Sequence, residues 1–328
     1  MSAPRGRRSK LVEERDVGAA APGAKEVDLG LDERGDGACL APRSSQDAAR
    51  LHGDTLTSRG SMPSSSRFLQ AVRHRGLTVP ARVDLLRAHT ARRVRRAAHA
   101  YAVRVGPATV FLSEDDYEID WASFAFVAID EAYEGDYRDA FVVDLGAHKG
   151  YYGAYALRHG ARGVVSYEPE STNASYLEAA AARLRGARTW RTARAAVGAE
   201  PGEAALHVMG SSWGHAIHPP DAWAEHEVGV ERVRVEALGD VLSRAAEQAR
   251  GARTIVKVNI EGEECPTILA TPAAAWTDVA VVYIEIHPWA TCGAAELAEH
   301  LVHAGLRSVP SNHSAVLKLS RAEIPRRE

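Results

Sequence analysis

Cysteine is scarce in this sequence. The three cysteines, Cys39, Cys265 and Cys292, lie far apart along a chain of 328 residues. An odd number of widely spaced cysteines argues against a disulfide framework and against a zinc knuckle. We therefore expect no disulfide framework, no metal site and a cytoplasmic location, where thiols stay reduced.

Long hydrophobic runs and a strong net charge are also missing. No apolar run reaches the roughly 18 residues that a membrane span needs, and residues 1–17 lack the apolar core of a secretory signal. The formal net charge is -3, so the molecule as a whole has little attraction for nucleic acid or for an anionic membrane. We expect neither of them as a partner.

Residues 1–66 contain no Phe, Tyr, Trp or Ile and are rich in Ala, Gly, Ser, Arg and Asp. Such a segment buries too little apolar surface to offset the entropy that is lost on ordering. We therefore predict a disordered N-terminal tail over residues 1–66.

Residues 67–106 are predicted to form a basic helical lead-in. Its arginines cluster at Arg92, Arg93, Arg95 and Arg96. One interpretation is an arm for nucleic acid or a protein partner, and the other is a solvated amphipathic helix in an Arg-rich chain. We favour the second, because no aromatic stacking platform accompanies the arginines.

Short β-rich segments alternate with helical segments from residue 107 onward. The predicted strands cover residues 141–145, 163–168, 190–197, 254–260, 279–287, 306–309 and 315–319, and the predicted helices cover residues 150–159, 173–185, 264–269 and 294–304. Strands that alternate with helices pair in parallel through right-handed crossovers. We predict an α/β fold with a doubly wound sheet over residues 107–320, followed by a short C-terminal tail at 321–328.

A glycine loop follows the first of these strands. Gly146 comes directly after residues 141–145 and lets the backbone approach a ligand with no side chain between them. In such folds the ligand lies beyond the carboxyl edge of the sheet. Glu168 ends the next strand, where its carboxylate can accept hydrogen bonds from both ribose hydroxyls of an adenosine.

The spacing of the loop discriminates between two cofactor classes. A dinucleotide site needs G-x-G-x-x-G, whereas this loop reads D-x-G-x-x-x-G with Asp144 before the first glycine. A carboxylate there disfavours a pyrophosphate and suits a ligand with an ammonium and a sulfonium group, such as S-adenosylmethionine. Asp144 would then orient the amino group of the ligand. A glycine turn without any ligand is the alternative, and Glu168 favours the adenosyl ligand.

Polar side chains alternate along two later strands. They are Lys257, Asn259 and Glu261 on residues 254–260 and just beyond, and Tyr283, Glu285 and His287 on residues 279–287. One interpretation is a buried ion pair of Lys257 with Glu285 or Glu261 that holds the sheet together. The other puts Asn259, Glu261 and His287 at the reacting group, because the chemistry of such folds occurs at the carboxyl ends of the strands.

These motifs occur together, in an order and spacing that resemble FkbM-type methyltransferases over roughly residues 110–320. The matching segments are residues 143–152 (VDLGAHKGYY), 167–169 (YEP), 256–264 (VKVNIEGEE) and 284–287 (IEIH). The resemblance implies the class I methyltransferase fold, a Rossmann-like sheet that is mostly parallel with an antiparallel C-terminal strand. It also implies S-adenosylmethionine as the methyl donor. The cofactor-binding residues that it implies are Asp144, Gly146, Ala147, Gly150, Tyr152 and Glu168.

The sequence departs from the family pattern at three positions. Asn259 stands where the family usually has Asp, His148 stands where it usually has Asn, and Gly239 interrupts its usual Leu-Asp pair. Asn259 keeps hydrogen-bonding capacity but loses the charge of Asp. A non-catalytic module that binds the adenosyl group is therefore one alternative to an enzyme. An NAD-dependent oxidoreductase is another, although the glycine spacing speaks against it.

We therefore predict an S-adenosylmethionine-dependent methyltransferase, with O-methylation of a small molecule, natural product or glycan as the leading activity. Methyl transfer needs the acceptor atom about 3 Å from the methyl carbon and in line with the breaking bond. A base near the acceptor hydroxyl helps, and His287 and Glu261 are the two candidates. The polar segment 210–215 either lines the acceptor pocket or forms an ordinary surface loop.

The composition of residues 1–66 generates the first testable prediction. A chain that starts at Arg67 should melt at the same temperature as the full chain and bind S-adenosylhomocysteine equally well, because the predicted tail contributes no packing. Differential scanning calorimetry and titration calorimetry on the two chains measure both quantities. A marked fall in the melting temperature would show instead that the tail packs on the domain.

Overall fold

A seven-stranded sheet forms the centre of the computed structural model, which describes residues 72–74, 76–93 and 99–321. Its strands are β3 (Phe141–Leu145), β4 (Gly163–Tyr167), β5 (Thr189–Ala193), β9 (Thr254–Val258), β10 (Val279–Glu285), β11 (Arg307–Ser308) and β12 (Val316–Ser320). Their order across the sheet is β11-β12-β10-β9-β3-β4-β5. Along this order, the neighbouring strands β5, β4, β3, β9 and β10 pair in parallel, and β12 runs antiparallel to both of its neighbours. The predicted α/β fold, mostly parallel with an antiparallel C-terminal strand, is confirmed.

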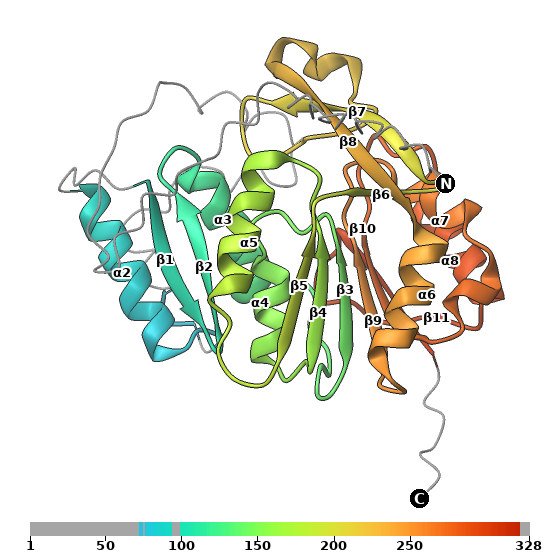
Figure 1. The fold of residues 1–328 in the computed structure, drawn as a ribbon, viewed down its shortest axis with the longest axis horizontal. Coiled ribbons are helices and arrows are strands. Elements are labelled where there is room, and N and C mark those ends of the chain that lie inside the picture. The colour runs from blue at the N-terminus through green and yellow to red at the C-terminus, as the bar shows by residue number, and fades with distance from the viewer. Residues whose placement is uncertain (1–71, 75, 94–98, 322–328) are drawn as a thin grey trace, which may run out of the picture.

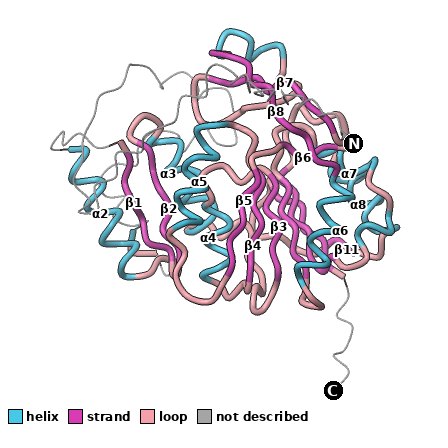
Figure 2. Tube along the Cα trace, in the orientation of Figure 1, coloured by secondary structure: helices cyan, strands magenta, loops and turns pink. Residues whose placement is uncertain are grey.

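Helices cover both faces of the sheet (Figure 1; Figure 2). On one side are α3 (Tyr117–Ala128), α4 (Tyr151–Arg158) and α5 (Ser171–Ala182), and on the other are α6 (Leu238–Ala249), α7 (Glu264–Ala270) and α8 (Ala294–His303). A short 3₁₀ helix, η3 (Ala273–Trp276), joins the second side. Successive side chains of a strand point to opposite faces. Val142 therefore belongs to the core under α4 and α5, and Val143 belongs to the core under α6 and α8.

The order in which the chain adds strands to the sheet reverses at β3. The strands β4 and β5 lie on one side of β3, and β9 and β10 lie on the other. In open α/β sheets, such a switch point leaves a crevice at the carboxyl ends of the strands, and ligands bind there. Gly146 follows β3 with a φ of 69°, and a Cβ on it would lie 1.7 Å from the carbonyl oxygen of Asn259. This glycine is therefore needed for the close approach of the two chain segments at the switch point, apart from any ligand.

The N-terminal part of the described chain adds a helix and a hairpin to the α4 side. These are α2 (Val79–Arg93), β1 (Ala100–Val105) and β2 (Ala108–Ser113), with β1 and β2 antiparallel. The helical prediction for 67–106 is wrong at residues 100–105, where Tyr101, Val103 and Val105 are buried in alternation. An alternating pattern favours a strand. The predicted tails at 1–66 and 322–328 and the arginines at 95 and 96 lie outside the described residues.

A second, three-stranded sheet lies above the carboxyl edge of the first (Figure 1). It consists of β6 (Ala196–Gly198), β7 (Gly202–Met209) and β8 (Glu227–Ala237), with the 3₁₀ helix η2 (Asp221–His226) between β7 and β8. The single strand predicted at 190–197 is thus split between two sheets. The hairpin and α6 were not predicted. Most side chains of the hairpin are exposed or half-buried, so it adds few apolar residues to the sequence pattern.

A buried lysine joins the N-terminal elements to the glycine loop. Lys149 is 1% exposed, and its Nζ lies 2.7 Å from both carboxylate oxygens of Asp120 on α3. Nζ also donates to Oγ of Ser113 at the end of β2. A buried charge is tolerated only when it is paired and hydrogen-bonded. This cluster therefore fixes α3 and the hairpin relative to the loop that follows β3.

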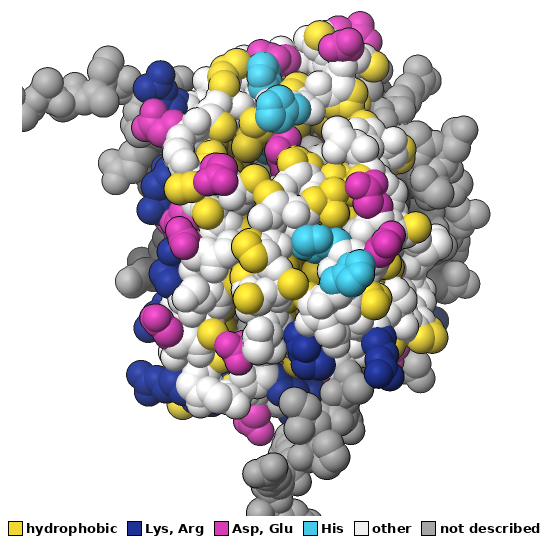
Figure 3. All heavy atoms as spheres, turned by 90° about the vertical axis from the view of Figure 1, so that its right-hand side faces the viewer, with side chains coloured by type: hydrophobic (Ala, Val, Ile, Leu, Met, Phe, Trp, Pro, Cys, Tyr) yellow, Lys and Arg dark blue, Asp and Glu magenta, His cyan; other side chains and the backbone are white. Residues whose placement is uncertain are grey.

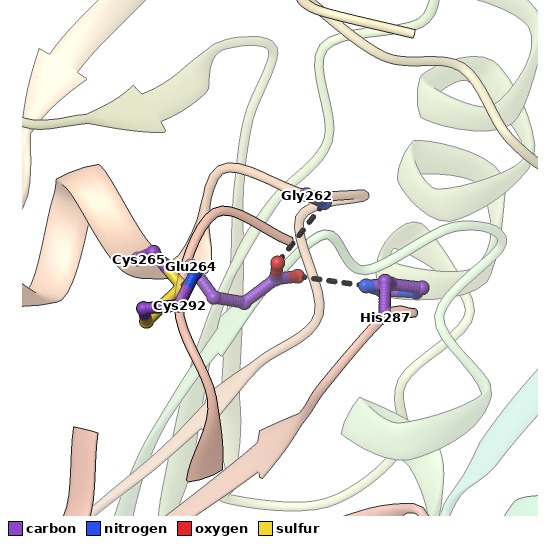
Figure 4. The surroundings of a disulfide bond; sticks show 5 residues. All are labelled: Gly262, Glu264, Cys265, His287 and Cys292. Atoms are coloured by element: carbon purple, nitrogen blue, oxygen red, sulfur yellow. Dashed lines mark hydrogen bonds and ion pairs between the residues drawn. A yellow bond between two sulfur atoms is a disulfide. The ribbon is translucent and has the colours of Figure 1, made fainter. Parts of the chain in front are cut away.

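Two of the three cysteines form a disulfide, so the expectation of a fully reduced chain is wrong for this pair. Cys265 at the start of α7 is bonded to Cys292, with a Cα–Cα distance of 5.7 Å (Figure 4). The two residues are 27 apart in sequence, but they follow β9 and β10, which are neighbouring parallel strands. Both cysteines therefore lie beyond the carboxyl ends of neighbouring strands, and this brings them together. Cys39 lies outside the described residues.

Charged and hydrophobic side chains are intermixed on the face over α6 and α8 that Figure 3 shows, with basic side chains along its left edge and at its lower end. Within the described ranges, no helix is long and apolar enough to cross a membrane. The same residues contain no group of three or more His, Cys, Asp or Glu side chains arranged to hold a metal ion.

The disulfide leads to a prediction about stability. Closing a loop of this length with a disulfide stabilises a fold by about 3–4 kcal/mol at 25 °C. Loss of the disulfide should therefore lower the melting temperature by roughly 10 °C. The doubly substituted variant Cys265→Ala/Cys292→Ala should show this fall in scanning calorimetry, with Cys39→Ser as the control. An oxidised wild-type protein that melts at the temperature of the double variant would contradict the stabilising role.

Candidate functional site

A cavity of about 980 Å³ opens at the switch point of the sheet. A volume of this size is typical of sites for small molecules and cofactors. The predicted site residues that line it are Gly146, Ala147, Tyr152, Glu168, Asn259, Glu261 and His287. Asp144 and Gly150 are not among the lining residues.

Asp144 lies beneath the glycine loop and is 0% exposed. Its Oδ1 is 3.3 Å from Nζ of Lys257, and Ser166 donates a hydrogen bond to its Oδ2. Burial raises the pKa of Asp144, and the charge of Lys257 opposes that rise. The residue is therefore held inside the protein by an ion pair, below the wall that a ligand would contact.

The partner of Lys257 differs from both predicted partners. Neither Glu285 nor Glu261 pairs with it, because Lys257 and Asp144 are register partners on the adjacent strands β9 and β3. Nζ of Lys257 also donates to the backbone carbonyls of Leu145 and Gly146, at 3.2 and 2.6 Å. Lys257 thus fixes the start of the glycine loop.

Gly150 and Tyr152 contribute through packing. Gly150 has a φ of 90°, and a Cβ on it would lie 2.8 Å from the indole of Trp190. Tyr152 is 2% exposed and borders the cavity, with its hydroxyl 3.4 Å from that of Tyr137. Both residues therefore help to seat α4 against the sheet under the cavity.

Glu168 lies on the cavity wall at the end of β4 and is 6% exposed. Its Oε2 accepts the backbone N–H of His148 at 2.7 Å, and its Oε1 accepts that of Glu170 at 3.0 Å. Burial raises the pKa of Glu168 to about 8, and the backbone hydrogen bonds oppose this rise. Each carboxylate oxygen retains acceptor capacity, so Glu168 can still accept hydrogen bonds from a ligand.

Other polar atoms on this side of the cavity have no hydrogen-bond partner in the described part of the chain. They include Oδ1 of Asn173 and Oγ of Ser212, both buried. The imidazole of His148 lies beside them, and burial holds its pKa well below the usual range, so it is neutral at pH 7. Buried polar atoms without partners are rare in folded proteins, and a polar ligand in the cavity would satisfy them.

Asn259 and Glu285 interact on the opposite side of the cavity. Nδ2 of Asn259 donates to Oε2 of Glu285 at 2.8 Å, and the hydroxyl of Tyr133 donates to the same oxygen at 2.9 Å. An ionised Asp at 259 could not make the first of these bonds, since it would oppose one carboxylate with another. Oδ1 of Asn259 is buried and has no hydrogen-bond partner among the described residues.

Glu261 and His287 lie next to each other at the ends of β9 and β10. Oε2 of Glu261 is 3.6 Å from Nε2 of His287, too far for a hydrogen bond. Burial raises the pKa of Glu261 to about 7, and the charge of His287 opposes this. Burial alone would lower the pKa of His287, but the carboxylates of Glu261 and Glu264 outweigh it and raise the pKa to about 10. His287 is therefore an imidazolium at neutral pH.

The loop between β7 and β8 covers the cavity. Residues 212–215 of segment 210–215 lie on the cavity wall, so the segment is not an ordinary surface loop, and its lining of an acceptor pocket stays a prediction. Nε1 of Trp213 donates to Oγ of Ser123 on α3 at 2.7 Å, and His218 pairs with Glu263 at 2.6 Å on the other side. The loop is thus bonded to both flanks of the cavity.

Sequence reasoning missed two groups that shape the site. One is Glu264, whose buried carboxylate contacts His287, and the other is a pair of indoles, Trp223 and Trp289, whose ring centroids are 4.5 Å apart. Two tryptophans in otherwise polar loops were the only signal for the second group. For Glu264 the sequence gives no signal beyond its place in the matched segment 256–264.

The sequence matches no known protein family and no curated protein, but solved structures are similar to it. The FkbM methyltransferase of Methylobacillus flagellatus KT is 16% identical with a TM-score of 0.37, and the match covers 63% of this chain and 56% of that one. This chain thus spans little more than half the length of that protein.

Two further solved structures are similar at the same level. A SAM-dependent methyltransferase from Agrobacterium tumefaciens is 8% identical with a TM-score of 0.33, and the match covers 68% of this chain and 69% of that one. A TehB-like SAM-dependent methyltransferase from Corynebacterium glutamicum is 11% identical with a TM-score of 0.31, with 63% and 96% covered. At similarity this low, the FkbM-type family stays a prediction.

Proposed function

We propose that this protein binds S-adenosylmethionine and transfers its methyl group to a hydroxyl of a small molecule, natural product or glycan. The observation that carries the proposal is that one cavity at the switch point joins two polar sides. Glu168 lies on the first side, and Asn259 and Glu261 lie on the second. A methyl donor and an acceptor can therefore bind within the same cavity.

The first side fits the adenosyl group. Glu168 can accept hydrogen bonds from ribose hydroxyls, and the buried atoms of Asn173 and Ser212 would gain polar partners. Gly146 and Ala147 present backbone without bulky side chains to the same space. Because Asp144 is paired with Lys257, we assign it the role of supporting the loop rather than of contacting the ligand's amino group.

The second side fits an acceptor that donates hydrogen bonds. Oδ1 of Asn259 and Oε2 of Glu261 both lack hydrogen-bond partners among the described residues and belong to residues of the cavity wall. The donor, when bound, supplies an electrophilic methyl group. The protein then has to align the acceptor hydroxyl with that group and receive its proton.

Glu261 is the better of the two candidate bases. An imidazolium has no lone pair, so His287 cannot take a proton while its pKa is about 10. Glu261 has a pKa of about 7 and a carboxylate oxygen without a hydrogen-bond partner. We propose that the acceptor proton passes to the carboxylate of Glu261, while the positive charge of His287, 3.6 Å from its Oε2, stabilises the ionised form.

Binding of S-adenosylhomocysteine tests the cofactor side. Replacing Glu168 with Ala should weaken binding by about 1–3 kcal/mol, because the ribose hydroxyls would be left unpaired in the site. Titration calorimetry on the wild type, on Glu168→Ala and on the exposed control Glu178→Ala measures the difference. Unchanged affinity in Glu168→Ala at an unchanged melting temperature would remove Glu168 from the site.

The pH dependence of methyl transfer tests the acceptor side. With methyl-labelled S-adenosylmethionine and a deproteinised metabolite extract of the native cells, label transfer should increase as the pH rises through about 7, because Glu261 ionises there. Glu261→Gln should lower the rate on the order of 10²-fold and abolish this rise, whereas the exposed control Glu203→Gln should change neither. A Glu261→Gln variant that keeps the wild-type rate and pH dependence would show that Glu261 is not the base. Catalysis would then rest on the positioning of the acceptor alone.

Label transfer also distinguishes the enzyme from a non-catalytic module. A protein that binds S-adenosylhomocysteine but transfers no label to any fraction of the extract would be an adenosyl-binding module.

A further inference from the structure

Glu264 is a buried acid, 0% exposed, at the first residue of α7. Its Oε1 accepts the backbone N–H of Ile260 at 2.8 Å, and its Oε2 accepts that of Gly262 at 3.0 Å. Nδ1 of His287 lies 3.2 Å from Oε1 (Figure 4). One carboxylate thus contacts the segment after β9 and the segment after β10.

The first two contacts bracket Glu261. Glu261 has a φ of 54° and Gly262 a φ of 100°, so the chain takes two consecutive left-handed residues here. A non-glycine residue persists in that conformation only where its surroundings hold it. The hydrogen bonds from Ile260 and Gly262 to Glu264 supply that constraint, and they keep the Glu261 carboxylate on the cavity wall.

The third contact orients His287. A carboxylate accepts and does not donate, so Nδ1 of His287 carries a proton toward Glu264. Nε2 is then the ring nitrogen that faces Glu261, at 3.6 Å. The acids that act on the imidazole are Glu261, Glu264 and Glu285, and the ring of Trp289 lies tilted against it with the ring centroids 4.7 Å apart.

A covalent bond holds the two segments together beside this carboxylate. Cys265 directly follows Glu264 and is bonded to Cys292, which lies in the same loop as His287 and Trp289 (Figure 4). The disulfide limits how far the start of α7 can move from the segment after β10.

We propose that Glu264 is a positioning residue: its one carboxylate holds the Glu261 turn on the cavity wall and fixes which ring nitrogen of His287 faces Glu261. The inference rests on the proposed function only in that Glu261 is the base. Glu264 itself does not line the cavity, so it acts through its neighbours rather than on the acceptor.

The ring nitrogen resonances of His287 test this directly. In protein labelled with ¹⁵N-histidine, the signal of His287 is assigned by its loss in His287→Gln. In the wild type, Nδ1 should be protonated across the titration, and the midpoint should lie at about 10. In Glu264→Gln the midpoint should fall by about one pH unit or more, because a neutral amide replaces the carboxylate.

Glu170→Gln is the matched control. Glu170 is also buried, at 4% exposure, and its carboxylate accepts the backbone N–H groups of Thr172 and Asn173 at the start of α5. This variant loses a buried carboxylate that caps backbone groups, but it leaves the surroundings of His287 unchanged. Both variants should lose stability, and only Glu264→Gln should move the His287 midpoint.

The outcomes separate this proposal from the proposed function. A wild-type His287 whose Nδ1 is unprotonated, or a midpoint that Glu264→Gln leaves in place, would overturn the positioning role. The wild-type spectrum decides this even if Glu264→Gln does not fold. Titration calorimetry with S-adenosylhomocysteine is the independent measurement: Glu264→Gln should bind like the wild type, and a wild type that does not bind would overturn the methyltransferase proposal alone.

Discussion

The ion pair of Asp144 and Lys257 joins the two halves of the sheet at the switch point, and the site is built on it. Both side chains are buried, so removing either would leave an uncompensated charge, at a cost of about 3–5 kcal/mol. Lys257 also bonds to the carbonyls of Leu145 and Gly146, which fixes the glycine loop. The same polar row continues through Ser166 to the indole of Trp190. One buried row thus links β9, β3, β4 and β5 below the cavity.

Three polar residues follow one another from β9 into the turn after it. Lys257 lies on β9 and forms an ion pair with Asp144. Asn259 lies just after the strand and donates a hydrogen bond to Glu285. Glu261 lies in the left-handed turn beyond it, 3.6 Å from His287. The alternation of the strand therefore ends before Glu261, and the turn rather than the strand sets where its carboxylate lies.

Much of this arrangement could be predicted from the sequence. The strands at 141–145 and 254–260 are continuous or alternating apolar runs followed by polar residues, and the parallel fold brings such strand ends together. Glu168, Asn259, Glu261 and His287 were located on the cavity in this way. The partner of Lys257 could not be predicted, because it depends on the register between β3 and β9. The disulfide was missed for a similar reason, since its cysteines meet only when β9 and β10 are neighbours.

The hairpin of β7 and β8 has a small core of its own. The buried cluster that it forms with β6 contains Ala196, Leu206 and Val233. Its loop is further joined to the rest of the domain by hydrogen bonds with Ser123, Asp116 and Glu263. Segments with few buried contacts open locally at a much smaller free energy than the whole domain. Local opening of this loop would leave the sheet, the Asp144–Lys257 pair and the disulfide-bonded start of α7 intact.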